Sequence, residues 1–194
     1  MKRDVLIILL GILLLGAAAT PAGAVPLGMD GGDGGTGFLY MAISASEAGV
    51  GFGYGSALYL GENAGVFLEG GEGAYALGAW YEPAESLVVA AKYAYAGGWI
   101  YTWYGWDYVA IDGFLLGAYY KFPSRGLFGG PYADKGVALF GAGAVTATDG
   151  YYTATAFFCE FQSLSYVSEN VAFTTALSFS KGMLVSTLGL AVVF

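Results

Sequence analysis

The last eleven residues alternate strictly between two kinds of side chain. One parity carries Leu184, Ser186, Leu188, Leu190, Val192 and Phe194, and the other carries Val185, Thr187, Gly189, Ala191 and Val193. A period of two over about ten residues is the length and pattern of one membrane-crossing β-strand. The segment therefore predicts a strand with one face in lipid.

The composition extends this prediction to the whole chain. Hydrophobic residues make up 57% of the 194 residues and charged residues only 11%, whereas a soluble domain is about 25% charged. After residue 24, no apolar run approaches the length of a membrane helix. Because lipid tolerates no unpaired backbone groups, a closed barrel is then the remaining membrane-spanning structure. We predict an all-β fold, a transmembrane antiparallel up-and-down β-barrel.

The N-terminus has the pattern of a cleavable signal peptide. Lys2 and Arg3 precede an apolar core over residues 5–15, and the small residues that follow predict cleavage after Ala24. The alternative is an uncleaved anchor, but a spanning helix needs about 20 apolar residues. The predicted organisation is a signal peptide at 1–24, a flexible Gly-rich leader at 25–35 and the barrel at 36–194.

Turn-forming residues divide the barrel region into ten candidate strands. These are Gly37–Ser46, Val50–Leu60, Gly65–Gly71, Gly73–Glu82, Ser86–Ala96, Ala110–Phe122, Gly136–Ala147, Tyr151–Leu164, Val171–Ser180 and Met183–Phe194. The count depends on a turn within residues 69–73, because one unbroken strand there gives nine, which the topology forbids. We therefore expect ten strands, with eight as the alternative.

Four polar residues are candidates for the lumen. Lys92, Lys121, Glu160 and Gln162 share a parity with small residues and oppose the bulky apolar row of their strands, which is the lipid-out, lumen-in pattern of a membrane barrel. The other inward positions are expected to be largely Gly, Ala, Val and Thr. We predict that Glu160, with Gln162, pairs with Lys92 or Lys121 and closes the lumen. The alternative is that each meets water in a small vestibule.

Aromatic residues gather in residues 97–109, which are predicted to be a loop. Trp99, Trp103 and Trp106 are three of the four tryptophans of the chain. One interpretation is a ligand-facing lid or saccharide platform. The other is an aromatic girdle with the base of a long hairpin.

The residues needed for most catalysis and metal binding are missing. The chain has no histidine and one cysteine, Cys159, so Ser/His/Asp and Cys/His nucleophiles are excluded and zinc is disfavoured. Glu69 and Glu72 are interpreted as solvated acids at a glycine turn. We predict no catalytic residue, no metal site and no cofactor. Without its signal the chain carries a net charge of about −9, which argues against nucleic acid as a partner.

Two segments resemble a known class of proteins. The C-terminal alternation closed by Phe194 resembles the last strand of bacterial outer-membrane β-barrels, and residues 117–123 with residues 136–143 (GAYYKFP and GVALFGAG) resemble OmpA-like and OmpW-like barrels. The resemblance implies location in the cell outer membrane, with outer-membrane lipid and the barrel-assembly machinery as partners. It implies that Leu190, Val192 and Phe194 form the assembly signal, and that the C-terminus and the segment Pro123–Lys135 are periplasmic.

These observations favour a non-enzymatic outer-membrane barrel with a structural or surface-interaction role and a narrow, partly plugged lumen. The alternative, which the OmpW-like resemblance implies, is a conduit for small hydrophobic solutes or a porin-like channel. A soluble periplasmic β-barrel is the competing fold.

Overall fold

The computed structural model describes residues 37–46, 49–71, 73–102, 105–124, 131–181 and 183–194. Within these residues it contains ten β-strands and one short 3-10 helix, η1 (Ala133–Lys135). The strands are β1 (Gly37–Ser46), β2 (Gly49–Tyr59), β3 (Ala64–Gly71), β4 (Ala74–Ala84), β5 (Leu87–Thr102), β6 (Gly105–Pro123), β7 (Val137–Thr148), β8 (Thr153–Tyr166), β9 (Val171–Ser180) and β10 (Met183–Val193). The signal peptide and leader, predicted at 1–35, lie outside the described residues. Within those residues, the structure contains no helix of the length and apolarity needed to cross a membrane.

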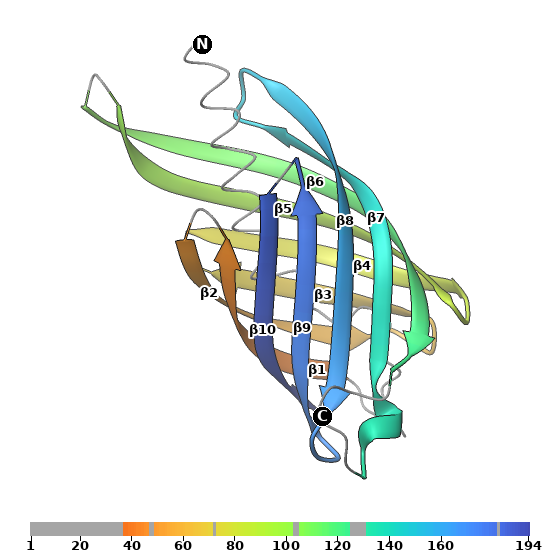
Figure 1. The fold of residues 1–194 in the computed structure, drawn as a ribbon. Helices are drawn as coiled ribbons and strands as arrows, with labels where there is room; N and C mark the ends of the chain where they lie inside the picture. The colour runs from red at the N-terminus through yellow and green to blue at the C-terminus, as the bar shows by residue number, and fades with distance from the viewer. Residues whose placement is uncertain (1–36, 47–48, 72, 103–104, 125–130, 182) are drawn as a thin grey trace.

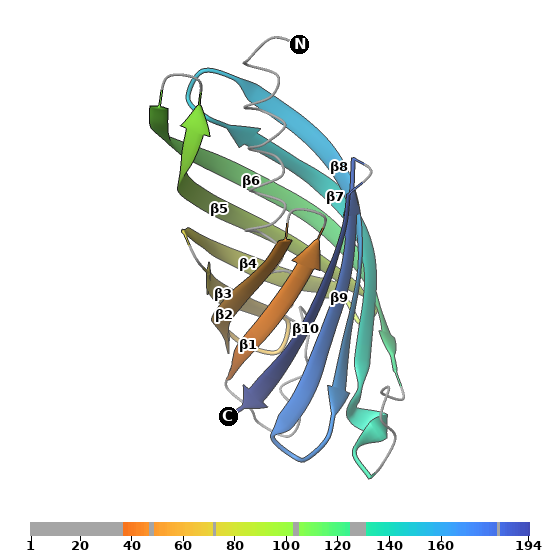
Figure 2. The ribbon, with the colours of Figure 1, turned by 60° about the vertical axis from the view of Figure 1, so that its left-hand side comes forward.

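The strands form a closed antiparallel barrel in which every strand pairs with its neighbours along the chain (Figures 1 and 2). Pairing of β1 with β10 closes the barrel and places Phe38 opposite Val193. We call the rim that contains Phe38 and Val193 the termini end, and the other rim the far end. The competing count of eight strands is wrong.

The turn that decides the strand count lies between β3 and β4. Gly73 has a φ of 71°, a left-handed conformation that glycine adopts without strain. The pairs Gly71↔Ala74 and Gly70↔Tyr75 follow directly from this reversal. Glu69, which the sequence suggested to be a solvated turn residue, instead lies within β3 and is only 2% exposed. Glu72 lies outside the described residues.

The two faces of the strands differ as the alternation predicts. On β10, Leu188, Leu190 and Val192 are exposed on the outside, whereas Ala191 is fully buried. Phe114, Leu116 and Tyr120 of β6 and Phe157 of β8 are likewise exposed; further exposed side chains of this kind include Leu39, Met41, Ile43, Leu68, Leu77, Phe140 and Leu177. The barrel therefore presents an apolar outer belt, which is the surface that a bilayer covers.

The prediction of a loop over residues 97–109 is wrong. β5 and β6 continue to pair through this region, with Gly98 opposite Val109 and Trp99 opposite Tyr108. Two adjacent glycines resemble a turn in the sequence, but here they are ladder residues of a hairpin that extends beyond the neighbouring strands (Figure 1).

Small residues do supply many of the inward positions, as expected, and twelve alanines and three valines are among the buried residues, but they do not fill the interior alone. Large rings occupy the interior, and the buried set includes Phe38, Tyr40, Phe67, Trp80, Tyr119, Phe158 and Tyr166. Glycines on adjacent strands make room for them. A Cβ on Gly65 would stand 2.1 Å from the Trp80 ring, and one on Gly78 would stand 2.2 Å from Phe67. Each glycine thus leaves the space in which a ring from a neighbouring strand packs.

Candidate functional site in the barrel interior

A row of three inward residues crosses strands β1, β2 and β3. Tyr40 pairs with Gly55, and Gly55 pairs with Glu69. The Tyr40 ring lies over Gly55, where a Cβ would meet its Cε1 atom at 2.5 Å. Across that glycine, the Tyr40 hydroxyl donates a hydrogen bond of 3.0 Å to Oε1 of Glu69. A side chain on the middle strand would block this contact.

The same row occurs again across β6, β7 and β8. Tyr119 pairs with Gly141, and Gly141 pairs with Glu160. The Tyr119 ring lies over Gly141, at 2.3 Å from where a Cβ would stand, and its hydroxyl donates to Oε2 of Glu160 at 3.1 Å. The two Tyr–Gly–Glu rows are five strands apart, so they lie in opposite halves of the ten-stranded barrel.

Lys92 of β5 links the two rows. Its Nζ donates to Oε2 of Glu69 at 3.4 Å, and both side chains are buried. Lys92 also interacts electrostatically with Glu160, which in turn interacts electrostatically with Glu69. Two buried carboxylates therefore share the field of one ammonium. A charge in this environment is tolerated only with partners, and the rows supply them.

Glu160 has neutral donors that Glu69 lacks at the matching position. Ser178, its partner on β9, donates to Oε1 at 2.8 Å, and Gln162 also hydrogen-bonds Glu160. The β4 residue opposite Glu69 is Ala76, which has no donor. Oε1 of Gln162 and Oγ1 of Thr174 are buried without a hydrogen-bond partner.

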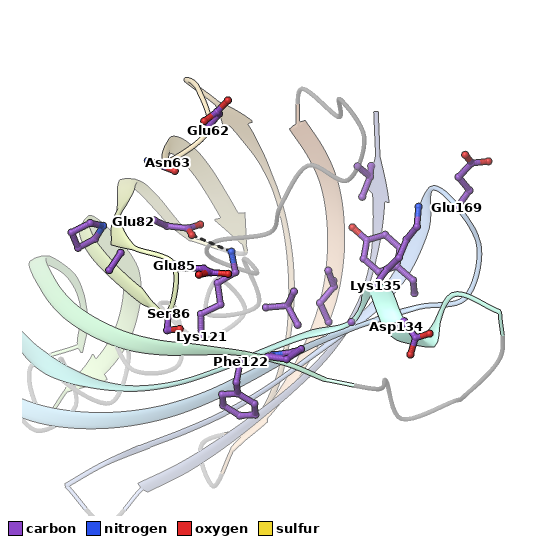
Figure 3. Close-up of a pocket in the computed structure, with 18 residues that line it drawn as sticks. Glu62, Asn63, Glu82, Glu85, Ser86, Lys121, Phe122, Asp134, Lys135 and Glu169 are labelled. Atoms are coloured by element: carbon purple, nitrogen blue, oxygen red, sulfur yellow. Dashed lines mark hydrogen bonds and ion pairs between the residues drawn. The ribbon is translucent and has the colours of Figure 1, made fainter.

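A second ion pair lies at the termini end. Nζ of Lys121 donates to Oε2 of Glu82 at 3.0 Å, and each side chain is 10% exposed. This pair stands at the wall of a cavity of about 720 Å³ formed by the turns of that rim (Figure 3). Acids outnumber lysines in its lining, which includes Glu62, Glu85, Asp134, Glu169 and Lys135. Leu164 and Val193, part of the buried core, supply an apolar portion.

The four lumen candidates occupy two places. Lys92, Glu160 and Gln162 are buried in the barrel wall facing inward, and Lys121 lies near the termini end. Glu160 was predicted to pair with Lys92 or Lys121, and of these two Lys121 forms an ion pair with Glu82. Lys92 interacts electrostatically with Glu160 and donates a hydrogen bond to Glu69. Sequence reasoning missed Tyr40, Glu69, Glu82, Tyr119 and Ser178. Parity was the available signal: Tyr40 alternates with Leu39 and Met41, and Glu69 alternates with Leu68 and Gly70.

The aromatic candidates lie on the hairpin that extends from the far end. Trp99 is in β5 and Trp106 is in β6, and both are exposed. Trp103 lies outside the described residues. Leu190 and Val192 are exposed on the outer face of β10, and Phe194, which follows the last residue of that strand, is also exposed.

The arrangement can hold and neutralise charge in a buried interior. Within the described part of the chain, no group of three or more His, Cys, Asp or Glu residues is placed to hold a metal ion. Each carboxylate oxygen of Glu69 and Glu160 already accepts a hydrogen bond.

No protein-family model and no curated protein matches the chain. Among solved structures, it is similar to the translocator domain of autotransporter NalP from Neisseria meningitidis (12% identity, 96% of this chain and 95% of that chain, TM-score 0.49). It is also similar to the Yersinia pestis outer membrane protein Ail (12%, 83% and 100%, TM-score 0.43) and to a de novo designed transmembrane β-barrel (13%, 82% and 96%, TM-score 0.44).

Because the identities are low and the TM-scores lie below 0.5, the description of the fold rests on this chain alone. Its strand order is closed, its outer face is apolar and its interior is buried and partly charged. A β-protein that spans a lipid bilayer needs these three properties, because lipid cannot satisfy unpaired backbone groups. The chain folds as a small ten-stranded β-barrel of the outer-membrane type.

Proposed function

We propose that the protein is a non-enzymatic outer-membrane barrel whose lumen is closed, and that it acts through its structure and its exposed surface. The observation that carries this proposal is the position of Lys92 between the two Tyr–Gly–Glu rows. The hydrogen bond of Lys92 to Glu69 and its electrostatic interaction with Glu160 connect β3 through β5 to β8, across an interior that ten strands leave narrow once side chains fill it.

The energetic cost of separating Lys92 from its carboxylate partners supports a closed lumen. An ion crossing the interior would have to displace Lys92 from its carboxylate partners, and breaking a buried ion pair costs about 3–5 kcal/mol. The rings of Phe38, Trp80 and Tyr166 lie in the same interior and belong to one buried hydrophobic cluster. The chain also contains no histidine, the usual general base near neutral pH.

Outer-membrane location is supported by the apolar outer belt and by the predicted signal peptide. In the orientation that the family resemblance implies, the termini end faces the periplasm and the β5–β6 hairpin projects outside the cell. We further propose that the barrel-assembly machinery binds Leu190, Val192 and Phe194, since all three are exposed at the C-terminal end of the chain. Deleting Phe194 should lower membrane yield, with Phe179→Ala, an exposed ring on β9, as the matched control. Normal yield of the deletion would contradict the assembly signal.

Single-channel recording in planar bilayers tests the closed lumen. Wild type should show no steady conductance. Glu160→Gln should introduce channel openings, because the charged group of Glu69, Lys92 and Glu160 loses a charge. Ala191→Ser is the control, since Ala191 is buried but does not belong to this charged group. Steady wild-type conductance unaffected by Glu160→Gln would contradict the proposal.

The conduit for small hydrophobic solutes is the second candidate, and the cavity at the termini end is the observation in its favour. A volume of about 720 Å³ is within the range of about 300–1,000 Å³ for ligand pockets. Its excess of carboxylates, however, suits a hydrophobic solute poorly. Uptake of a monoaromatic solute by wild-type proteoliposomes, at a rate above that of empty vesicles, would favour this candidate.

A further inference from the structure

The cavity at the termini end carries an excess of negative charge. Within the described residues, five carboxylates and two lysines line its volume of about 720 Å³. Four of the carboxylates are exposed and lie on separate segments of the rim: Glu62 in the β2–β3 turn, Glu85 in the β4–β5 turn, Asp134 in η1 and Glu169 in the β8–β9 turn (Figure 3). None of these four side chains forms a hydrogen bond or an ion pair in the part of the chain that the structure describes. The rim therefore presents carboxylates with which no described lysine pairs.

The fifth carboxylate, Glu82, leaves one oxygen open in the wall of the same cavity. Its side chain is only 10% exposed, and its Oε2 accepts a hydrogen bond of 3.0 Å from Lys121. Among the described residues, none donates a hydrogen bond to its Oε1. Because buried polar atoms are usually paired with a hydrogen-bonding partner, this oxygen can accept an N–H group from a molecule in the cavity.

The spacing of the carboxylates decides what kind of cation fits. Mg²⁺ and Ca²⁺ require several oxygen ligands around one point. In the described part of the chain, no group of three or more His, Cys, Asp or Glu residues is placed to hold a metal ion. The same lining contains apolar side chains, which are Leu164 and Val193 of the buried core together with Phe122 and Val137. The complementary ligand therefore carries several positive charges separated by apolar segments.

We propose that this cavity binds linear aliphatic polyamines, in which short methylene chains separate the ammonium groups. The ammonium groups pair with the rim carboxylates, one of them donates to Oε1 of Glu82, and the methylene chains lie against Leu164 and Val193. The volume of about 720 Å³ is within the range of about 300–1,000 Å³ for ligand pockets. The proposal requires neither a closed lumen nor a particular orientation in the membrane, so a conducting barrel would leave it intact.

Isothermal titration calorimetry of the folded chain in a neutral detergent, at low ionic strength, tests the proposal. Spermidine should bind more tightly than putrescine, and putrescine more tightly than butylamine. Each lost ammonium group should weaken binding about two- to fivefold, the range for exposed ion pairs. Mg²⁺ should bind more weakly than putrescine, although the two have the same charge, because it offers no methylene chain and the carboxylates do not converge on one point.

Substitutions at the rim test the location of the site. Glu85→Gln and Glu169→Gln remove exposed charges from two different turns, and each should weaken spermidine binding about two- to fivefold. Glu82→Gln should weaken binding more, because a buried charge is screened less than an exposed one. Asp149→Asn is the matched control at the far end, where the Asp149 side chain accepts hydrogen bonds from two backbone N–H groups, and its affinity should equal that of the wild type. Heat-modifiable migration on gels verifies that each variant is folded, and the two exposed rim variants decide the result if Glu82→Gln does not fold.

Four results would contradict the proposal. Equal affinities for spermidine and butylamine would overturn the recognition of several charges, and binding of Mg²⁺ as tight as that of putrescine would overturn the role of the methylene chain. Wild-type affinity in both rim variants would place the polyamine elsewhere on the protein. A basic protein segment is the competing occupant, and its probe is trilysine amide, which matches the charge of spermine. Tighter binding of this peptide than of spermine would overturn the proposal in favour of such a segment.

Discussion

The two halves of the barrel place a buried carboxylate in the same way and neutralise it differently. In β1–β3 and in β6–β8, a tyrosine reaches over a glycine to a glutamate on the next strand but one. Glu69 accepts its second hydrogen bond from Lys92, whereas Glu160 accepts its second from Ser178. A carboxylate in the barrel interior can thus be held by a hydrogen bond from an ammonium, or by neutral donors within the electrostatic field of the same ammonium.

The difference indicates which half is more vulnerable. Neutral hydrogen-bond donors can still serve a carboxylate when a neighbouring charge is lost, because each bond is local. An ammonium shared between two carboxylates cannot be removed without leaving both with excess charge. We therefore expect the first half to be more sensitive to substitution, and free energies of unfolding measured by denaturant in lipid vesicles can break or sharpen that expectation.

Lys92→Met should have the largest effect, with a loss of about 3–5 kcal/mol, because it leaves buried carboxylate charge uncompensated. Urea unfolding followed by tryptophan emission measures the loss. Lys135→Met is the control, since Lys135 is exposed at the termini end, and it should cost less than about 0.5 kcal/mol. A small effect of Lys92→Met would show that the carboxylates do not need the ammonium.

Tyr40→Phe should cost about 1.5–3 kcal/mol, the range for a hydrogen bond to a charged group. Tyr119→Phe should cost less, because Ser178 and Gln162 still donate to Glu160. The same unfolding assay, run on both variants in one lipid, gives the difference directly. Equal losses, or a larger loss for Tyr119→Phe, would remove the distinction between the halves.

The sequence was sufficient for the strands but not for the rows. Alternation is a local property, so the bounds of β1 and β9 and the outward placement of Leu188 and Leu190 follow from it. A Tyr–Gly–Glu row depends on the register of three strands, which separates Tyr40 from Glu69 by 29 residues. Register is a relation between distant segments. Glu69 was also misplaced because its glycine neighbours resemble a turn, when they are strand residues that leave room for rings.

Gly55→Ala and Gly141→Ala should each cost about 1–3 kcal/mol through overpacking, and their losses should be similar. Each new Cβ would meet a tyrosine ring and also a backbone oxygen, of Leu68 at 2.6 Å or of Ala118 at 2.5 Å. Gly61→Ala offers a contrast, because a Cβ there would meet nothing within 4 Å, although its φ of 137° adds backbone strain. Unchanged stability of Gly55→Ala or Gly141→Ala would mean that the tyrosine rings do not depend on the space that these glycines leave.

The smallest effect is expected at the residue that pairs with each glutamate on the next strand. This residue is Ala76 on β4 and Ser178 on β9. Ser178→Ala removes a donor from Glu160 and should cost about 1 kcal/mol, since Tyr119, Gln162 and Lys92 remain. The opposite change, Ala76→Ser, should have little effect in the wild type, where Glu69 already binds Tyr40 and Lys92.

In the Lys92→Met background, however, Ala76→Ser should recover about 1 kcal/mol, because the new hydroxyl would give Glu69 the kind of donor that Ser178 gives Glu160. A double-mutant cycle of Lys92→Met with Ala76→Ser measures this coupling. Ala94→Ser, one strand further along the same ladder row, is the control and should recover nothing. If Ala76→Ser gives no recovery, neutral donors do not replace the ammonium, and the two halves differ by more than the residue that pairs with each glutamate.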